Sequence, residues 1–582
     1  MKLPSMKYAD GIRKAVQVRF GGYNHNLGTG DGEIYDMKNL SSVNYPLLSV
    51  RPKRKLYKTL SEPGDIFGHE RLLVIDGTGL YYDGILRGEV QPGKKRIAAL
   101  GDRLVIFPDK KVLNVKYERK GIFGTKEQLF EEVLNPSKYD AYGVGESLPY
   151  ELFVWDGEEW ISLGAELSNL ESRWSGSMLT FENGEIYGEE AKANALRNDE
   201  VDWREYFRTG DAVKIRGCNV FPENNKTPII REISEDGHTM YFSEYAFTLS
   251  GENRDEAYTE NGNLCVERLV PDLTDICVND NRVWGCKDDT IYCSALGDPY
   301  NWYVFDGVES DAWACDTGTA GGFTACCSYL GYPIFFKENS ICKVYGSLPS
   351  NFAPMVSASL GVAEGGMDSL AVAGEILFYL SKAGIAAYSG GVPSRIGEVF
   401  GGVRYTEAVG GSDGLKYYVS MKDEEENRSL FVYDTSLGIW HREDESEAVS
   451  FAYTDGLCFL DSDGNIWSVS GNCTGEEEER VEWFAQFGDF TDSEPNAKAV
   501  SKIHIRLELG VGAEARVFIQ YDSDGIWEKV HELSAISKRS VYLPVIPRRA
   551  DHYSIKIEGS GDCRIYSIAR EFYSGSAIET TR

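Results

Sequence analysis

Short strand–turn–strand units recur along most of this 582-residue chain, and this repetition limits the possible fold more than any other feature. Aromatic and β-branched residues flank D-G, N-G or similar turns, the pattern typical of β-hairpins. Examples are LLVIDGTGLYYDG (72–84), GYPIFFKENSICKVYG (331–346) and LCFLDSDGNIWSVSG (457–471). From Val283 onward the hairpins recur about every 40–50 residues, the length of one propeller blade. Because an isolated hairpin cannot bury its apolar face, we predict an all-β fold in which about six to eight blades form a β-propeller.

Two regions depart from this repeat. Residues 165–270 contain a segment that predicts a helix over 188–207, followed by alternating apolar strands around Asn/Gly/Asp turns, the pattern of a small inserted β-barrel. After the acidic run Glu476–Glu479, which we interpret as a solvated linker, the chain contains regular alternating strands that predict a C-terminal β-sandwich. The predicted domains are a basic N-terminal arm with the first strands (1–60), the propeller in two parts (61–164 and 271–475), the inserted barrel domain with a helix (165–270) and the sandwich (480–582).

Charge is distributed unevenly along the chain. The net charge is −31, but residues 1–60 carry 11 Lys/Arg against 4 Asp/Glu, so the remaining residues hold a net −38. The basic end includes Arg51, Lys53, Arg54 and Lys55, which predict a docking site for an acidic partner. A strand edge protected by lysines is the alternative. The acidic remainder repels phosphate, which argues against a general nucleic-acid clamp.

The sequence motifs that commonly mark nucleotide-binding and metal-binding sites are missing. There is no Walker A run, no G-x-G-x-x-G that opens a helix, and no H-E-x-x-H among the 7 histidines. Gly410–Gly414 matches G-x-S-x-G, but a strand follows it directly, so it predicts a hairpin loop and not a nucleophile elbow. We therefore predict no catalytic residue, no cofactor site and no metal site, and no enzymatic activity. With 91 acidic residues, a carboxylate pair of a glycosidase or a sugar-binding lectin stays open as an alternative.

Seven of the 12 cysteines lie between Cys277 and Cys342 without any C-x-x-C pair. We interpret these cysteines as buried, small apolar side chains, and the alternative that some of them pair in space stays open. The first 20 residues have no apolar core of a signal peptide, and no stretch approaches the ~20 apolar residues of a membrane span. The sequence thus predicts a soluble chain made in the cytosol, without a membrane anchor.

Three segments carry a resemblance to a known family. They are GGYNHNLGTGDGEIYDMKNLSSVNYPLLSVRPKRK (21–55), NRVWGCKDDTIYCSALGDPYNWYVFDG (281–307) with YLGYPIFFKENSICKVYGSLPSNF (329–352), and the end of the chain over 517–530 and 539–572. In pattern they resemble propeller-containing virion proteins of tailed phages and prophages. The architecture is similar to the tail nozzle (tail tubular protein B) and to packaged-DNA stabilisation proteins.

This resemblance implies a structural virion subunit in the phage tail or neck, assembled in the bacterial cytoplasm. It implies a cyclic homo-oligomer, with a hexamer expected, that contacts portal, adaptor or tail proteins and conducts or retains genomic DNA without binding it specifically. It brings no catalytic residues. The alternative function is a receptor- or glycan-binding tail protein, since exposed aromatic side chains suit stacking on sugars, and a glycosidase is the third.

Overall fold

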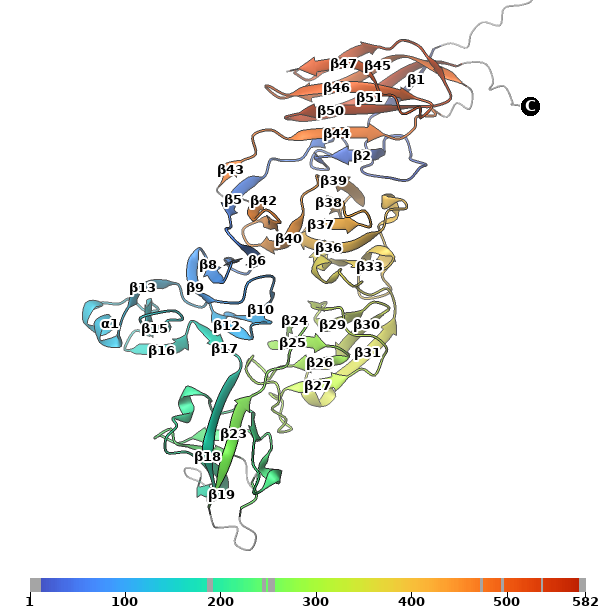
Figure 1. The fold of residues 1–582 in the computed structure, drawn as a ribbon. Helices are drawn as coiled ribbons and strands as arrows, with labels where there is room; N and C mark the ends of the chain where they lie inside the picture. The colour runs from blue at the N-terminus through green and yellow to red at the C-terminus, as the bar shows by residue number, and fades with distance from the viewer. Residues whose placement is uncertain are drawn as a thin grey trace, which may run out of the picture. The chain divides into compact units, whose positions relative to one another are not determined.

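The computed structural model describes residues 12–185, 192–242, 247–249, 257–471, 475–492, 497–534 and 537–574 (Figure 1). The all-β prediction is confirmed, because these residues form many small β-sheets and a single α-helix, α1 (Lys126–Glu132). No helix in the described part of the chain is long and apolar enough to span a membrane. The chain divides into two compact units, the first formed by Met1–Leu72 with Ala363–Arg582 and the second by Leu73–Val362.

The first unit holds three small antiparallel sheets in which each strand follows its neighbour in sequence. The central strand Ile376–Ser381 of the first of these sheets is buried at five consecutive positions, and because successive side chains point to opposite faces, both faces of this sheet are packed. The strands are β32 (Ala371–Ala373), β33 (Ile376–Ser381), β34 (Gly384–Tyr388) and β35 (Ser394–Arg395); β36 (Tyr405–Ser412), β37 (Lys416–Asp423), β38 (Arg428–Asp434) and β39 (Ile439–Arg442); and β40 (Ala448–Tyr453), β41 (Leu457–Asp461) and β42 (Asn465–Ser468).

The last of these sheets is completed by an N-terminal strand. Strand β5 (Lys55–Thr59) pairs antiparallel with β42, and the short β43 (Glu476–Glu477) pairs with β5 in turn. Strand β6 (Pro63–Gly68) lies beside β40, where the backbone N–H of Ile66 donates to Ser450 Oγ at 3.2 Å. The two chain segments that make up this unit are thus joined through one sheet.

Two larger sheets complete the first unit. One contains β3 (Leu40–Ser41), β4 (Leu48–Val50), β51 (Cys563–Ser574), β45 (Lys498–Leu509) and β48 (Arg539–Pro544), with β1 (Arg13–Gln17) on β51 and β49 (Arg549–Ala550) on β45. The other contains β2 (Ile34–Lys38), β44 (Glu482–Phe487), β50 (Tyr553–Ser560), β46 (Glu514–Tyr521) and β47 (Glu528–Ser534). Ile505 of the first sheet and Ile519 and Ile557 of the second belong to one hydrophobic core. N-terminal strands therefore contribute to both sheets of the C-terminal region.

The second unit repeats the small-sheet pattern. Its strands are β7 (Leu72–Asp76), β8 (Gly79–Tyr82) and β9 (Ile85–Glu89); β10 (Arg96–Leu100), β11 (Arg103–Phe107), β12 (Lys111–Asn114) and β17 (Leu167–Asn169); β24 (Asp275–Asn279), β25 (Arg282–Lys287), β26 (Thr290–Cys293) and β27 (Trp313–Asp316); and β28 (Ala325–Tyr329), β29 (Tyr332–Lys337), β30 (Ser340–Tyr345) and β31 (Ala353–Ala358).

Two insertions interrupt this series. The first is a four-stranded sheet of β13 (Arg119–Phe123), β14 (Ala141–Val144), β15 (Glu151–Trp155) and β16 (Trp160–Ala165), and the N-cap hydroxyl of Thr125 starts the adjoining helix α1. The second is a six-stranded sheet of β18 (Ser172–Glu185), β19 (Lys192–Arg197), β20 (Val213–Arg216), β21 (Ile230–Ile233), β22 (Thr239–Phe242) and β23 (Tyr258–Arg268). Backbone bonds from Val213 to Pro228 and from Ile215 to Lys226 join its two ends, as in a barrel.

The predicted helix over 188–207 is wrong where the structure describes it, and residues 188–191 lie outside the described part. Residues Lys192–Arg197 form strand β19, which pairs with β18 and β22, and only the short 3-10 turn Trp203–Glu205 is helical. Two partner strands satisfy the backbone of β19, and Leu196 is buried in the core of this sheet. These tertiary contacts outweigh the local helix propensity of the segment.

Cysteines of the described residues remain free thiols. Eleven are described, nine of them buried, and Cys473 lies outside the described residues. Burial raises the pKa of Cys342 to about 12. This agrees with their interpretation as small apolar side chains.

Candidate functional site

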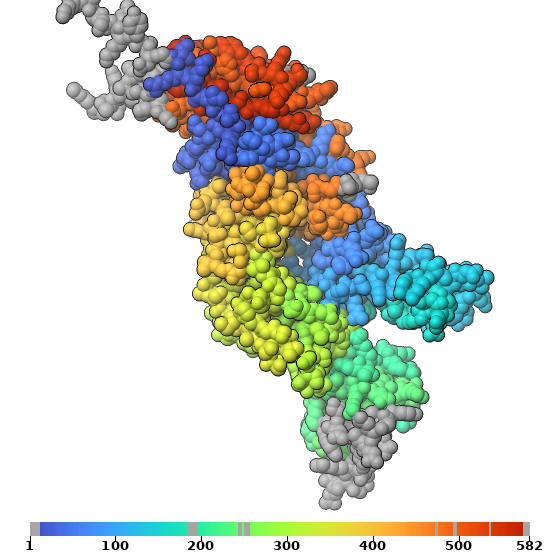
Figure 2. All heavy atoms as spheres, turned by 180° about the vertical axis from the view of Figure 1, so that it is seen from behind, coloured from blue at the N-terminus to red at the C-terminus, as the bar shows by residue number. Residues whose placement is uncertain are grey.

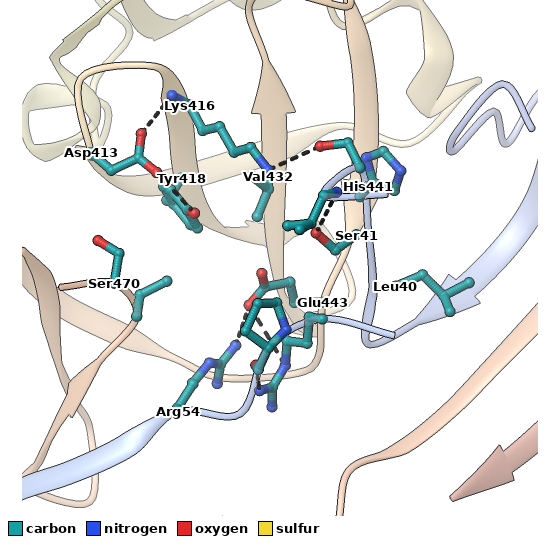
Figure 3. Close-up of a pocket in the computed structure, with 15 residues that line it drawn as sticks. Leu40, Ser41, Arg54, Asp413, Lys416, Tyr418, Val432, His441, Glu443 and Ser470 are labelled. Carbon is teal, nitrogen blue, oxygen red and sulfur yellow. Dashed lines mark hydrogen bonds and ion pairs between the residues drawn. The ribbon is translucent and has the colours of Figure 1, made fainter. Parts of the chain in front are cut away.

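A polar cavity of about 160 Å³ lies in the first unit, between the N-terminal segment and the sheet β36–β39 (Figure 3). Its wall combines hydroxyl, carboxylate, imidazole, ammonium and guanidinium groups with a few apolar side chains. The lining residues are Leu40, Ser41, Ser42, Val43, Arg51, Pro52, Arg54, Asp413, Lys416, Tyr418, Val432, His441, Glu443, Val469 and Ser470.

Sheet register explains how one wall of the cavity is built. Tyr418 of β37 lies opposite Val432 of β38, which lies opposite His441 of β39, so the three side chains form one row across the sheet. Lys416 lies two residues before Tyr418 and therefore on the same face. Asp413 lies in the turn before β37, where its carboxylate accepts a hydrogen bond from the Lys416 backbone N–H at 2.7 Å.

One end of this wall contains a hydrogen-bonded charge pair. Ser42 Oγ donates to Asp434 Oδ2 at 2.6 Å, and Lys416 Nζ lies 2.9 Å from Ser42 Oγ and 3.7 Å from Asp434 Oδ2. Burial would raise the pKa of Asp434, but hydrogen bonds from Ser42 and Ser436 and the charge of Lys416 hold it below its ordinary value. Asp434 is therefore a carboxylate at neutral pH, and it holds Lys416 at the cavity wall.

His441 is the buried titratable group of the cavity, with only 5 % of its surface exposed. Burial, aided by the positive charge of Lys416 and opposed by Asp434, lowers the pKa of His441 to about 4. The imidazole is thus neutral at pH 7, with one nitrogen a donor and the other an acceptor. Among the described residues, no hydrogen bond to either ring nitrogen is formed, so both are available to a ligand.

The opposite end of the cavity is an ion-pair cluster, which we call the Arg51–Arg54 cluster. Arg54 donates to Glu443 Oε2 at 2.6 Å and to Asp444 Oδ2 at 2.8 Å, and Arg51 binds both carboxylate oxygens of Glu478, at 2.7 and 2.9 Å. Burial opposes ionisation of Asp444 and Glu478, but the arginines hold the pKa of both carboxyls below the usual range. The cluster joins three segments that are far apart in sequence.

The four residues predicted to dock a partner divide into two pairs. Arg51 and Arg54 are 5 % and 3 % exposed and bind carboxylates of their own chain. Lys53 Nζ lies 3.6 Å from Glu477 Oε2, and Lys55 opens strand β5. Docking through these residues stays a prediction, while the structure gives two of them an internal role. The run Glu476–Glu479, predicted as a solvated linker, supplies Glu478 to the cluster and the strand β43.

Sequence reasoning missed Ser42, Lys416, His441 and Glu443 as neighbours. Ser42 and Asp434 are 392 residues apart in sequence, so no local spacing marks them. The segment Gly410–Gly414, predicted to be a hairpin loop, is a loop only in part. Gly410–Ser412 form the end of strand β36, and Asp413 and Gly414 lie in the turn before β37, where Asp413 lines the cavity. Among the residues that the structure describes, no cluster of three or more His, Cys, Asp or Glu side chains is arranged to hold a metal ion.

Comparison with known proteins gives only remote similarity. No protein-family model and no curated protein matches the sequence. An exo-β-1,3-galactanase from Phanerochaete chrysosporium is 9 % identical with a TM-score of 0.20, over 50 % of this chain and 92 % of that chain. PorZ, of the type IX secretion system of Porphyromonas gingivalis, is 11 % identical with a TM-score of 0.17, over 89 % and 78 % of the two chains. A family 43 arabinoxylan arabinofuranohydrolase from Bacillus subtilis is 10 % identical with a TM-score of 0.14, over 83 % and 95 %.

The prediction that the chain has no enzymatic activity is corrected by these findings. Glycoside hydrolases recur among the solved structures that resemble it, so the exclusion of an enzyme does not stand. At TM-scores of 0.14 to 0.20 the likeness assigns neither a substrate nor a catalytic residue. The phage-tail prediction receives no support from the comparisons.

Proposed function

We propose that this chain is a glycan-binding tail protein of a bacterial virus and that the cavity beside Lys416 and His441 holds a saccharide. The observation that carries the glycan part is the lining of that cavity. Its wall offers a neutral imidazole that has no hydrogen-bond partner in the described part of the chain, together with serine hydroxyls, an ammonium group and carboxylates, and it encloses about 160 Å³. Sugar hydroxyls both donate and accept, so a wall that mixes the two kinds of group suits them.

The apolar part of the lining fits the same ligand class. Leu40, Val432 and Val469 lie among the polar groups, and the ring of Tyr418 is buried beside them. The C–H faces of a pyranose pack on such surfaces, and tyrosine combines an apolar body with a polar tip. The location in a virion tail is supported by the sequence resemblance alone.

The small sheets support a propeller for this protein. The two units contain three and four sheets of blade size, which is compatible with the predicted six to eight blades. The pairing of β5 with β42 also fits this architecture, since a strand from the start of a propeller often completes its last sheet. A DNA-conducting ring, the role first expected from the sequence, would use the same subunit shape and stays a prediction.

Saccharide binding is tested with labelled fragments of bacterial cell-wall polysaccharide as the probe. Lys416→Ala and His441→Ala should each weaken binding by about tenfold or more, the loss expected for one hydrogen bond to a charged or buried group. Lys287→Ala, an exposed lysine in the second unit, is the matched control and should bind as the unmodified chain does. If no polysaccharide fraction binds, or if the cavity variants bind unchanged, the glycan proposal is wrong.

Hydrolysis is the second candidate, because two carboxylates, Asp413 and Glu443, line one cavity. Glycosidases use such a pair as acid and as base or nucleophile. Glu443 Oε2 accepts a hydrogen bond from the Arg54 guanidinium at 2.6 Å, so we assign Glu443 the role of base or nucleophile and Asp413 the role of acid. The assay measures release of reducing ends from the polysaccharide. This activity is established if the unmodified chain releases them and if Asp413→Asn and Glu443→Gln each abolish the release. Binding without such release would leave the protein a lectin.

A further inference from the structure

The outer face of the sheet that contains β45 and β51 is a basic and aromatic surface, which we call the basic face. Along β45, Ile503, Ile505 and Leu507 are buried, so the alternate residues Lys502 and Arg506 point outward. The face is formed by Lys14, Lys502, Arg506, Lys538, Tyr542 and Tyr566, with Arg564 at one end. In Figure 2 the dark blue N-terminal residues, which include β1, lie against the red C-terminal residues. Its charge is opposite in sign to the net −31 of the chain.

Two cations of the basic face, Arg506 and Lys538, have no carboxylate partner among the residues that the structure describes. Glu571 is bound by Lys14 at 2.6 Å and lies 3.5 Å from Lys502, and Glu508 lies 3.7 Å from Arg564. Arg506 and Lys538, by contrast, lie over the ring of Tyr566, at 5.9 and 4.2 Å from its centroid. Neither forms an ion pair with any residue that the structure describes. Tyr542, 48 % exposed, supplies apolar area beside them.

The same chain presents a matching acidic turn. Asp423–Glu426 connects β37 with β38. Asp423 accepts hydrogen bonds from the turn backbone, and Glu426 lies 3.4 Å from Lys422. Glu424 and Glu425 are exposed, and their carboxylates have no partner within the described residues. One turn therefore offers two free carboxylates, and the basic face offers two free cations.

We propose that the basic face of one copy of this chain binds the Asp423–Glu426 turn of a second copy. The occupant is inferred from charge complementarity. A short turn, held by the Asp423 carboxylate, can bring two carboxylates to Arg506 and Lys538. The carboxylates of the face itself already have partners, since the Tyr566 hydroxyl donates to Glu508 at 2.9 Å and Lys14 binds Glu571 at 2.6 Å. A polyanion such as DNA carries charge along its whole length and would meet those two carboxylates as well. Face and turn are different surfaces, so the contact is heterologous and can close into a ring. This contact does not depend on glycan binding at the cavity.

Charge reversal on the full chain tests the contact. In sedimentation velocity at 0.05 M salt, Arg506→Glu with Lys538→Glu should weaken self-association by about 100-fold, because two attractive contacts become repulsive. Glu424→Lys with Glu425→Lys should do the same. The variant that carries all four changes should associate again, since the signs are exchanged and the geometry is kept. High salt should weaken association of the unmodified chain.

Matched controls separate this contact from net charge. Arg395→Glu with Arg404→Glu, and Glu158→Lys with Glu159→Lys, change the net charge by the same amounts at exposed sites elsewhere. Both should associate as the unmodified chain does. A chain that is monomeric at all concentrations, or a four-change variant that stays dissociated, overturns the proposal. The proposal is also overturned if the chain binds duplex DNA and if charge reversal at Arg506 and Lys538 abolishes this binding but leaves self-association unchanged. Unaltered melting temperatures verify that each variant is folded.

Discussion

The Arg51–Arg54 cluster and the basic face both contain a pair of cationic side chains, but one pair is buried and the other is exposed. In the cluster, Arg51 and Arg54 are almost fully buried and bind Glu443, Asp444 and Glu478. On the basic face, Arg506 and Lys538 are exposed and lie over a tyrosine ring. A buried cation needs a carboxylate partner, because burying an unpaired charge costs much free energy, whereas an exposed cation without a partner is hydrated by water. Cations close in sequence can therefore serve the fold, while the cations available to a partner come from distant strands.

The largest expected effect comes from breaking the buried cluster. Arg54→Met removes the shorter ion pairs of Glu443 and Asp444 and leaves only Arg51, at 3.8 and 3.6 Å, beside them. Breaking a buried ion pair by removing one partner costs about 3–5 kcal/mol of unfolding free energy. Urea unfolding of the first unit should show this loss. If Arg54→Met loses less than about 1 kcal/mol, the cluster is solvated and the contrast with the basic face disappears.

His441 should give the next largest effect, as a dependence of stability on pH. Its pKa is lowered to about 4 in the folded chain, so between pH 6.5 and 4 the unfolded chain binds the additional proton. Stability is therefore fully present above pH 6.5 and is lost as the pH falls, by about 3 kcal/mol in all. His441→Asn should remove this part of the pH profile of the melting temperature. An unchanged profile would show that His441 is solvated.

Glu478→Gln should have a smaller effect, of about 2 kcal/mol, because it weakens the charge-assisted hydrogen bonds to Arg51. The folded pKa of Glu478 is lowered, so its contribution is present above the ordinary carboxyl pKa of about 4 and is lost as the pH falls through the folded value. The variant should accordingly lose less stability than the unmodified chain below pH 4. Acid unfolding followed by circular dichroism compares the two.

The smallest effect is expected on the basic face. Arg506→Ala should change the free energy of unfolding by no more than about 0.5 kcal/mol, as at other exposed positions. Thermal unfolding of the chain at low concentration, where copies are apart, gives this value. A loss above 1 kcal/mol would mean that the contact with Tyr566 stabilises the sheet itself.

The repeated hairpins were predictable from sequence because their signal is local. LLVIDGTGLYYDG and GYPIFFKENSICKVYG alternate around tight turns, and both form the paired strands that this pattern indicates. The helix prediction for 188–207 was wrong because the helix propensity of this segment is outweighed by the pairing of β19 with β18 and β22. The predicted propeller part 61–164 includes most of the inserted sheet β13–β16. No local pattern shows that β13 and β14 pair in parallel, so the insertion was not visible in the sequence.

The cavity could not be predicted, since it depends on contacts between remote segments. Arg54 and Glu443 are 389 residues apart, and Arg51 and Glu478 are 427 apart. The basic run 51–55 and the acidic run 476–479 can each be recognised in the sequence. Their opposite charges alone did not show that the two runs bind each other. An external partner was equally compatible with the same residues.

Strand β5 has a consequence for how the chain is made. Its partner β42 follows about 400 residues later, so on the ribosome Lys55–Thr59 waits for most of the polypeptide to be translated. At elongation rates of about 5–20 residues per second, this interval lasts at least about 20 seconds. A truncated product that ends before Asn465 leaves an open strand edge for proteases and chaperones to detect. The sheet that contains β5 and β42 therefore forms only after most of the chain has been synthesised.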